Sequence, residues 1–292
     1  MKSVLLEEGD LELVEALRLR ARRRMAGFAA GEQRSPVLGG GIEFADWREY
    51  RPGDDVRLLD WSVWLRSRKL LVKLCAEEKE LTLMTIIDAS RSMDYGSPPK
   101  IRLAKRVACV LSGIALRGGN RAGIAVLGPR LLEPLRPERG RVSLPDVARV
   151  LASIGPVARP APVEGLRRFA ARYGRKCVAV LVSDLLFEEG EAALDALAAS
   201  GCEAHVVQVL APEELEPPER GEATLVDMED GSEAPVHADT ALLARYSDRL
   251  SSFLAATASA CAARGLGHHL VASDAGLGRL FLEGFRKGGL LC

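Results

Sequence analysis

The chain has 292 residues, enough for one large α/β domain with an appended module, and its 48% hydrophobic content supports a substantial core. Its 40 basic and 40 acidic side chains cancel, so no global field favours binding to nucleic acid or to an anionic membrane. No segment approaches the roughly 20 apolar residues that cross a bilayer, and the N-terminus lacks the apolar region of a signal peptide. We therefore expect a cytoplasmic protein with no transmembrane segment and, given widely spaced cysteines without a Cys-x-x-Cys pair, with reduced and buried thiols.

The first predicted element is a helix from Asp10 to Met25. Its first half carries Glu12 and Glu15, an order that complements the helix dipole because the second half is basic. The basic residues are Arg18, Arg20, Arg22, Arg23 and Arg24. A patch for RNA or acidic lipid is one interpretation, but the zero net charge favours a solvated helix end. Residues 27–41, rich in Gly, Ala, Ser and Pro, predict a flexible connection.

Charged and aromatic residues concentrate between residues 41 and 64. Opposite charges surround the turn pair Pro52-Gly53, which predicts a lattice of ion pairs. All three tryptophans of the chain, Trp47, Trp61 and Trp64, lie here and predict a small satellite core. A partner-binding hot spot is the alternative, since Trp and Arg are the usual anchors of interfaces.

An apolar run that starts at Leu81 ends on Asp88, and two hydroxyls follow at Ser90 and Ser92. Such a run predicts a buried parallel strand, and ligands of open α/β sheets bind at the carboxyl ends of such strands. The Asp-x-Ser-x-Ser spacing lets one carboxylate and two hydroxyl oxygens converge on a hard cation such as Mg²⁺. An Asx turn or a helix cap is the alternative interpretation.

A second apolar run, residues 177–182, ends on Ser183 and Asp184. If the two strands lie side by side, Asp88 and Asp184 meet at one rim of the sheet. Repulsion between neighbouring carboxylates then favours either a bound cation or a raised pKa for one of them.

Strands and helices alternate from residue 81 onward. This order predicts a doubly wound, mostly parallel α/β sheet to which a hairpin of residues 122–127 and 131–135 adds one antiparallel edge strand. Pro134 suits an edge position. The other predicted elements are helices over 100–116, 145–154, 163–173, 191–200, 240–264 and 277–285, and strands over 204–210 and 268–272.

We divide the chain into residues 1–80, an N-terminal helix and appended module, and residues 81–292, the α/β domain. Asp230-Gly231 predicts a small hairpin insertion near residues 223–237. His268 and His269 would point to opposite faces of the last strand, so we expect no shared zinc site there.

The loop Asp88-Ala89-Ser90-Arg91-Ser92 with Val182-Ser183-Asp184 resembles the metal-ion-dependent adhesion site of von Willebrand factor A domains. Residues 41–61 resemble the signature of the bacterial DUF58 proteins, and the resemblance runs to the last helix. It implies a von Willebrand A-like, Rossmann-like fold, an ion such as Mg²⁺, Mn²⁺ or Ca²⁺, and a MoxR-type AAA+ ATPase as partner.

The full adhesion site also uses a Thr from the loop before a middle helix, and no Thr stands there in this chain. The nearest candidate is Ser143. The expected metal ligands, direct or through water, are Asp88, Ser90, Ser92, Asp184 and Ser143. The expected partner-binding residues of the signature are Arg48, Tyr50, Arg51, Asp54, Asp55, Asp60 and Trp61.

Enzymatic interpretations meet specific obstacles. The chain has neither a phosphate-cradling Gly-rich loop nor a Gly-x-Ser-x-Gly nucleophile elbow. A phosphatase-like fold needs an acid two residues after its nucleophilic Asp, and Ser90 cannot serve as that acid. We expect no enzymatic activity but a metal-dependent protein-interaction module, with the ATPase and an unknown client protein as partners. A metal-free scaffold or, less favoured, a phosphatase-like hydrolase is the alternative.

Overall fold

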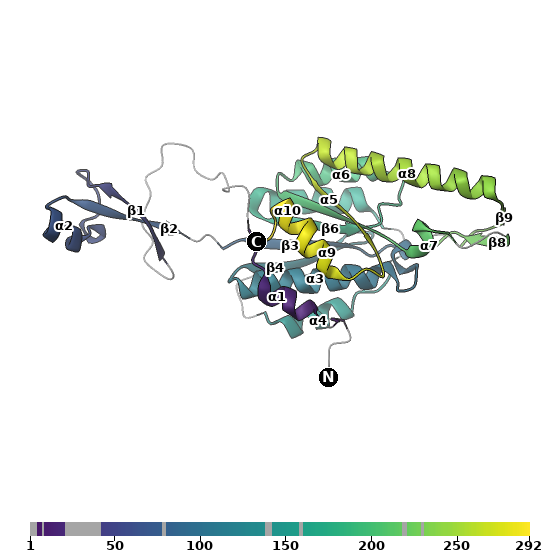
Figure 1. Cartoon of the computed structure of the whole chain (residues 1–292), viewed down its shortest axis with the longest axis horizontal. Helices are drawn as coiled ribbons and strands as arrows, with labels where there is room; N and C mark the ends of the chain where they lie inside the picture. Colours follow the sequence, from purple (N-terminus) through teal and green to yellow (C-terminus); the bar gives the residue numbers. More distant parts are fainter. Residues whose placement is uncertain are drawn as a thin grey trace. The chain divides into compact units, whose positions relative to one another are not determined.

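The computed structural model describes residues 5–7, 9–20, 42–77, 80–137, 142–157, 160–217, 221–228 and 231–292. The chain forms two compact units (Figure 1). The larger unit comprises residues 1–26 and 81–292, and the smaller unit comprises residues 27–80. The N-terminal helix, which the sequence-based division placed in residues 1–80, therefore belongs to the larger unit.

The larger unit is built on a six-stranded sheet with the strand order β10-β7-β6-β3-β4-β5. All neighbours pair in parallel except β5, which pairs antiparallel with β4 at the edge. The predicted doubly wound, mostly parallel sheet with one antiparallel edge strand is confirmed. The strands are β3 (Thr82–Asp88), β4 (Arg121–Leu127), β5 (Leu131–Leu135), β6 (Val178–Ser183), β7 (Glu203–Leu210) and β10 (Gly267–Ala272).

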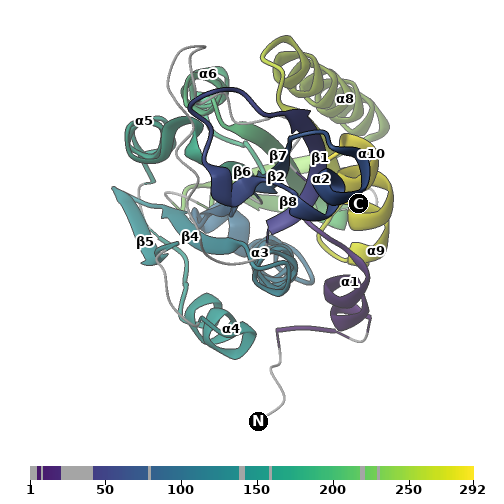
Figure 2. The ribbon, with the colours of Figure 1, turned by 90° about the vertical axis from the view of Figure 1, so that its left-hand side faces the viewer.

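Helices cover both faces of this sheet, which explains why its central strands are predominantly apolar. Along β3, Leu83 and Ile87 enter a core with α1, α3, α4 and the C-terminal helices, whereas Met84 and Ile86 enter a second core with α5, α6 and α8. Figure 2 shows α3 and α4 on one side of the sheet and α5, α6 and α8 on the other. The helices are α1 (Asp10–Ala16), α3 (Lys100–Arg117), α4 (Leu144–Ala152), α5 (Pro162–Tyr173), α6 (Gly190–Ala199) and α8 (Thr240–Ala263).

The predicted closing helix is a segment of mixed type. Short turns of α-helix, α9 (Leu277–Arg279) and α10 (Arg286–Gly288), flank a π-helical stretch, Leu280–Phe285. None of the helices among the described residues combines the length and apolar character that membrane crossing requires.

The N-terminal helix ends at Ala16, earlier than predicted. Residues 18–20 run antiparallel to the end of the chain: the Arg20 backbone N–H donates to the Leu290 carbonyl at 2.8 Å, and Leu19 forms a bridge with Leu291. This long-range pairing replaces the helix that local propensity favours. Residues 21–26, with the other predicted arginines, lie outside the described residues.

The helix α1 is held on α3 by a buried ion pair. Arg106 donates to both carboxylate oxygens of Asp10 at 3.1 Å, and the two side chains are 6% and 4% exposed. Arg106 also pairs with Glu7 at 2.9 Å. Breaking such a pair would leave a buried charge without a partner, so these contacts assign the helix to the larger unit.

In the smaller unit, β1 (Ile42–Glu49) pairs antiparallel with β2 (Leu71–Glu77), and between them lie a 3₁₀ turn, Val56–Leu58, and α2 (Trp61–Ser67). The predicted ion pairs form, but among the described side chains of this unit the tryptophans do not form the predicted satellite core. Trp47 is 44% exposed, Trp61 is 54% exposed, and α2 has no buried residue. The predicted connection over residues 27–41 lies outside the described residues.

The hairpin predicted near residues 223–237 is formed by β8 (Gly221–Val226) and β9 (Glu233–Ala238), which pair antiparallel. A single helical turn, α7 (Pro212–Leu215), follows β7 and precedes this hairpin. It supplies one side chain to the site described below.

Candidate metal centre

The two carboxylate-bearing loops meet at one edge of the sheet. Strands β3 and β6 pair in parallel, with Ile87 opposite Val182, so both strands end at the same rim. The Ser183 hydroxyl donates to Asp88 Oδ2 at 2.6 Å, and Asp184 follows directly. The prediction that these two distant segments lie side by side is confirmed.

Asp88 is a buried carboxylate at the end of the central strand, and it is 1% exposed. Its Oδ1 accepts from the Ser90 backbone N–H at 2.9 Å, the hydrogen bond of an Asx turn. Burial and, secondarily, the charge of Asp184 raise the pKa of Asp88 from 3.8 to about 6. A cation at this position would relieve both effects.

The Ser90 side chain contacts this carboxylate, and the Ser92 hydroxyl lies beside that of Ser90. A 3₁₀ turn over Arg91–Asp94 follows Ser90, and it brings the Ser90 and Ser92 hydroxyl oxygens to 2.9 Å from each other. Met93, fully buried in the same turn, anchors the loop on the core. The loop thus presents one carboxylate and two hydroxyls together.

A buried lysine, which sequence reasoning missed, engages the second carboxylate. Lys100 Nζ donates to Asp184 Oδ2 at 2.8 Å and to Glu214 Oε1 at 2.6 Å, and the lysine is 0% exposed. Asp184 Oδ1 accepts from the Leu186 backbone N–H at 3.0 Å. A signal was present in the sequence: Lys100 lies three residues before Leu103, on the apolar face of α3.

Ser143, the nearest candidate for the missing Thr, is exposed at the start of α4. Its hydroxyl donates to Asp146 Oδ2, and its backbone N–H donates to the same oxygen at 3.2 Å. The structure gives Ser143 a helix-capping role.

The residues at the rim fit a hard divalent cation by donor chemistry. Asp88, Ser90 and Ser92 offer the oxygen ligands that Mg²⁺, Mn²⁺ and Ca²⁺ prefer. Within the described part of the chain, no three His, Cys, Asp or Glu side chains cluster in a way that could hold a metal ion. An ion at the rim would therefore depend on the two hydroxyls, and Asp184 is already engaged by Lys100.

The two adjacent histidines of β10 have different neighbours, as predicted. His268 Nε2 lies 3.0 Å from Gln208 Oε1, whereas His269 Nε2 lies 3.2 Å from His205 Nδ1. Burial and, secondarily, His268 lower the pKa of His269 from 6.5 to about 4. The two histidines therefore contact different side chains of β7.

The charged residues of the signature segment bind one another. Arg48 forms a bidentate pair with Asp54 at 2.6 and 2.7 Å, which lowers the pKa of Asp54 to about 2. Asp55 pairs with Arg57 at 2.8 Å. The pairing stabilises the turn around Pro52-Gly53.

Of the remaining predicted partner-binding residues, Asp60 and Tyr50 make contacts within the smaller unit, whereas Arg51 and Trp61 are exposed. Asp60 caps α2 by accepting from the Ser62 backbone N–H at 3.0 Å, and it also accepts from Trp47 Nε1 at 3.1 Å. Tyr50 is half-buried, and its backbone N–H donates to the Leu70 carbonyl. Arg51 and Trp61 are exposed.

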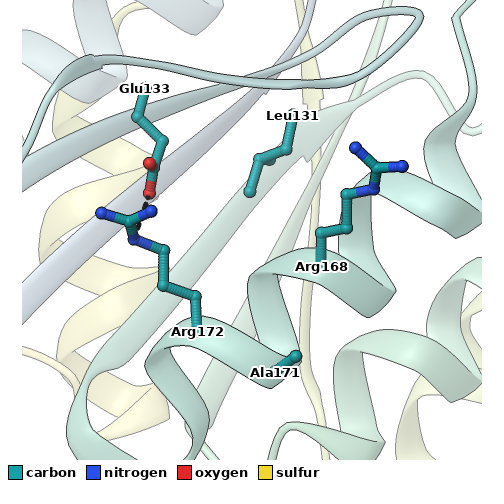
Figure 3. A pocket seen from close by; sticks show the side chains of 5 residues that line it. All are labelled: Leu131, Glu133, Arg168, Ala171 and Arg172. Atoms are coloured by element: carbon teal, nitrogen blue, oxygen red, sulfur yellow. Dashed lines mark ion pairs between the residues drawn. The ribbon is translucent and has the colours of Figure 1, made fainter.

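An open pocket of about 360 Å³ lies elsewhere, between β5 and α5 (Figure 3). Its polar lining is already paired: Arg172 Nε lies 3.1 Å from Glu133, and Arg168 Nε lies 2.7 Å from Glu164. None of its lining residues belongs to the rim.

Comparisons with known proteins agree with the resemblance of the signature segment. A family model described as "Protein of unknown function DUF58" matches residues 46–252. The chain is 32% identical over 247 residues to an uncharacterized protein of Mycobacterium tuberculosis. The aligned segment covers 80% of this chain and 76% of that relative. By its fold and candidate site, the chain is an α/β protein with an Asp-x-Ser-x-Ser loop at the rim of its sheet. The chain belongs to the DUF58 family.

Similar solved structures include BatB from Bacteroides thetaiotaomicron, at 17% identity and a TM-score of 0.43, covering 66% of this chain and 90% of that chain. A von Willebrand factor type A protein from Catenulispora acidiphila has 13% identity and a TM-score of 0.37, covering 75% of this chain and 43% of that chain.

Proposed function

We propose that this chain is a non-enzymatic protein-interaction module that binds a partner through a divalent cation held by Asp88, Ser90 and Ser92. The observation that supports it is the group of polar side chains at the end of the central strand. The Asp88 carboxylate is buried there, and the hydroxyl oxygens of Ser90 and Ser92 lie 2.9 Å from each other. The donor set suits Mg²⁺, with Mn²⁺ and Ca²⁺ as substitutes.

The charge of the rim favours an acidic partner. Lys100 compensates the charge of Asp184, so Asp88 is the carboxylate of the rim whose charge a bound cation would neutralise. The bound cation would supply an electrophilic position for an acidic side chain of the partner. A rim rich in uncompensated carboxylates would repel such a side chain.

We propose a MoxR-type AAA+ ATPase as the partner that supplies energy, with an unidentified protein as client. This proposal rests on the DUF58 resemblance. In the smaller unit, the exposed Trp61 and Arg51 are the residues that suit a contact, because aromatic and arginine side chains anchor interfaces. Other residues of the signature would support that surface through contacts within the smaller unit: Arg48, Asp54, Asp55, Asp60 and Tyr50.

Calorimetry and thermal melts with Mg²⁺ and Mn²⁺ test the metal site. We expect heat of binding and a raised Tm for the wild type, and neither for Asp88→Ala. Asp239→Asn is a matched control, because this carboxylate caps α8 through the Leu242 backbone N–H and has no contact with the rim. The control should lose some stability and keep ion binding.

Two outcomes would overturn the proposal. A wild type without heat or Tm shift would be a metal-free scaffold. Phosphate release from an aryl phosphate that Asp88→Asn abolishes would instead favour a phosphatase-like hydrolase. A pull-down from the native host, with and without chelator, then tests the partner: we expect chelation to release it.

A further inference from the structure

Lys100 is a fully buried cation that belongs to the rim of the sheet. It is the first residue of α3, and its ammonium lies 2.8 Å from Asp184 and 2.6 Å from Glu214. The side chains of Lys100 and Asp184 are 0% and 1% exposed, so water screens their interaction little. Glu214 is 16% exposed and comes from α7, the turn that follows β7.

Among the described residues, Lys100 is thus the buried cation that contacts two of the three carboxylates at the rim. Asp184 and Glu214 both contact Lys100, and the negative charge of Asp184 in turn acts on Asp88. Buried carboxylates need a cation or a proton, and here the chain itself supplies a cation. An ammonium on Asp184 and a divalent ion beside it would repel each other.

We propose that Lys100 sets the affinity of the rim for a divalent cation, because its ammonium occupies the position next to Asp184 that such a cation would otherwise occupy. This deepens the proposed function, because it concerns the same rim, and it makes Lys100 a specificity-determining residue. The ammonium keeps the site weak and leaves the bound ion dependent on a ligand from the partner. Removal of the ammonium frees Asp184 and Glu214 and converts the rim into a tighter divalent-cation site.

A purely structural role is the competing explanation. Glu214 Oε2 accepts from the Ala211 backbone N–H at 2.7 Å, and the Glu214 carbonyl accepts from the Tyr246 hydroxyl at 2.7 Å. Lys100 could simply tie α3 to this turn. A structural tie would change stability when removed, but it would not tighten the binding of an ion.

The experiment is a Mn²⁺ titration by calorimetry, with thermal melts, on the wild type and Lys100→Gln. We expect Lys100→Gln to bind Mn²⁺ at least tenfold more tightly than the wild type. Lys105→Gln is the matched control: Lys105 is on the same helix and donates to the Ile154 carbonyl rather than to a carboxylate. Its affinity should equal that of the wild type.

Two double variants sharpen the result. Lys100→Gln with Asp184→Asn should lose the gain, because the freed carboxylate is gone. Lys100→Gln with Glu214→Gln removes one negative charge together with the positive charge. This double variant replaces Lys100→Gln in the titration if the single variant does not fold without metal. It should still bind at least tenfold more tightly than the wild type.

The outcomes separate this inference from the proposed function. Mn²⁺ affinity in the folded lysine variants that is equal to or weaker than that of the wild type overturns the role of Lys100, whatever the wild type does. A wild type without binding overturns the proposed function alone, provided that the lysine variants gain binding. If neither the wild type nor the folded variants bind Mn²⁺, both fail.

Discussion

The hydroxyl of Ser183 donates to Asp88 Oδ2 at 2.6 Å and so joins two loops whose residues are 95 positions apart in the chain. The same oxygen of Ser183 accepts from the Leu185 backbone N–H at 2.9 Å. Both contacts are buried. The serine therefore orients the carboxylate and closes the turn after β6.

Ser183→Ala should destabilise the protein by about 1–3 kcal/mol, because it leaves a buried carboxylate oxygen and a buried N–H without these partners. Urea unfolding measures the change. Ser112→Ala is the matched control, since the buried Ser112 hydroxyl has no hydrogen-bond partner. That variant should not be destabilised, because it removes a buried hydroxyl that has no hydrogen-bond partner among the described residues. Equal losses in both variants would contradict the role of Ser183.

Asp88→Asn should stabilise the metal-free protein at pH 7 by about 1–3 kcal/mol. Burial and Asp184 raise the pKa of Asp88 to about 6, so the folded protein prefers the protonated carboxyl. As pH rises from 4 through 6, the unfolded chain releases this proton first, and stability falls. An asparagine at this position does not ionise, so the variant avoids this loss of stability. The check is unfolding with chelator at pH 4 and pH 7: a variant less stable than the wild type at pH 7 would contradict the prediction.

His269 should make the protein less stable in mild acid. Its pKa is lowered from 6.5 to about 4 by burial and by His268, so below pH 6.5 the unfolded chain binds a proton that the folded chain refuses. From pH 7 to pH 4 this effect should cost roughly 3 kcal/mol. His269 contacts His205 and Phe285, so His269→Phe keeps a ring there.

The difference between His269→Phe and the wild type isolates this histidine from Asp88, which acts in the same pH range with the opposite sign. Unfolding of both proteins at pH 7 and pH 4 measures it. His237→Phe, a change at an exposed histidine, is the control and should follow the wild type. A parallel pH dependence of His269→Phe and the wild type would exclude the assignment.

Trp61→Ala should weaken ATPase binding at least tenfold, the loss that truncation of an interface anchor produces, about 1.4 kcal/mol or more. Because Trp61 is 54% exposed, the Tm should change little. Binding is measured with the purified ATPase. Leu132→Ala, at a 37% exposed position of the larger unit, should leave binding unchanged. A large drop in Tm with Trp61→Ala would instead indicate a structural role.

The sheet was predictable because its central strands are continuous apolar runs that end on polar residues. Asp88 and Asp184 could be assigned to one rim on the condition that their strands are parallel neighbours, which the structure shows. The end of α1 at Ala16 was not predictable, because it depends on pairing of residues 18–20 with residues 290–292. Neither was the contact of Lys100 with Glu214, which requires two elements 114 residues apart to meet.

The tryptophans illustrate a second limit. Their proximity in sequence suggested a satellite core, yet Trp61 and Trp64 touch only edge to face, with ring centroids 6.1 Å apart, and Trp61 remains largely exposed. Clustering along the chain does not determine whether side chains point inward or outward when the elements are short.

The larger unit is discontinuous: residues 1–26 and 81–292 belong together, and residues 27–80 are inserted between them. The buried ion pair of Asp10 with Arg106, which joins α1 to α3, lies within that larger unit, so we expect an internal deletion of residues 27–80 to spare its core. The proposed cation site in the larger unit and the proposed partner surface around Trp61 could then be assayed separately.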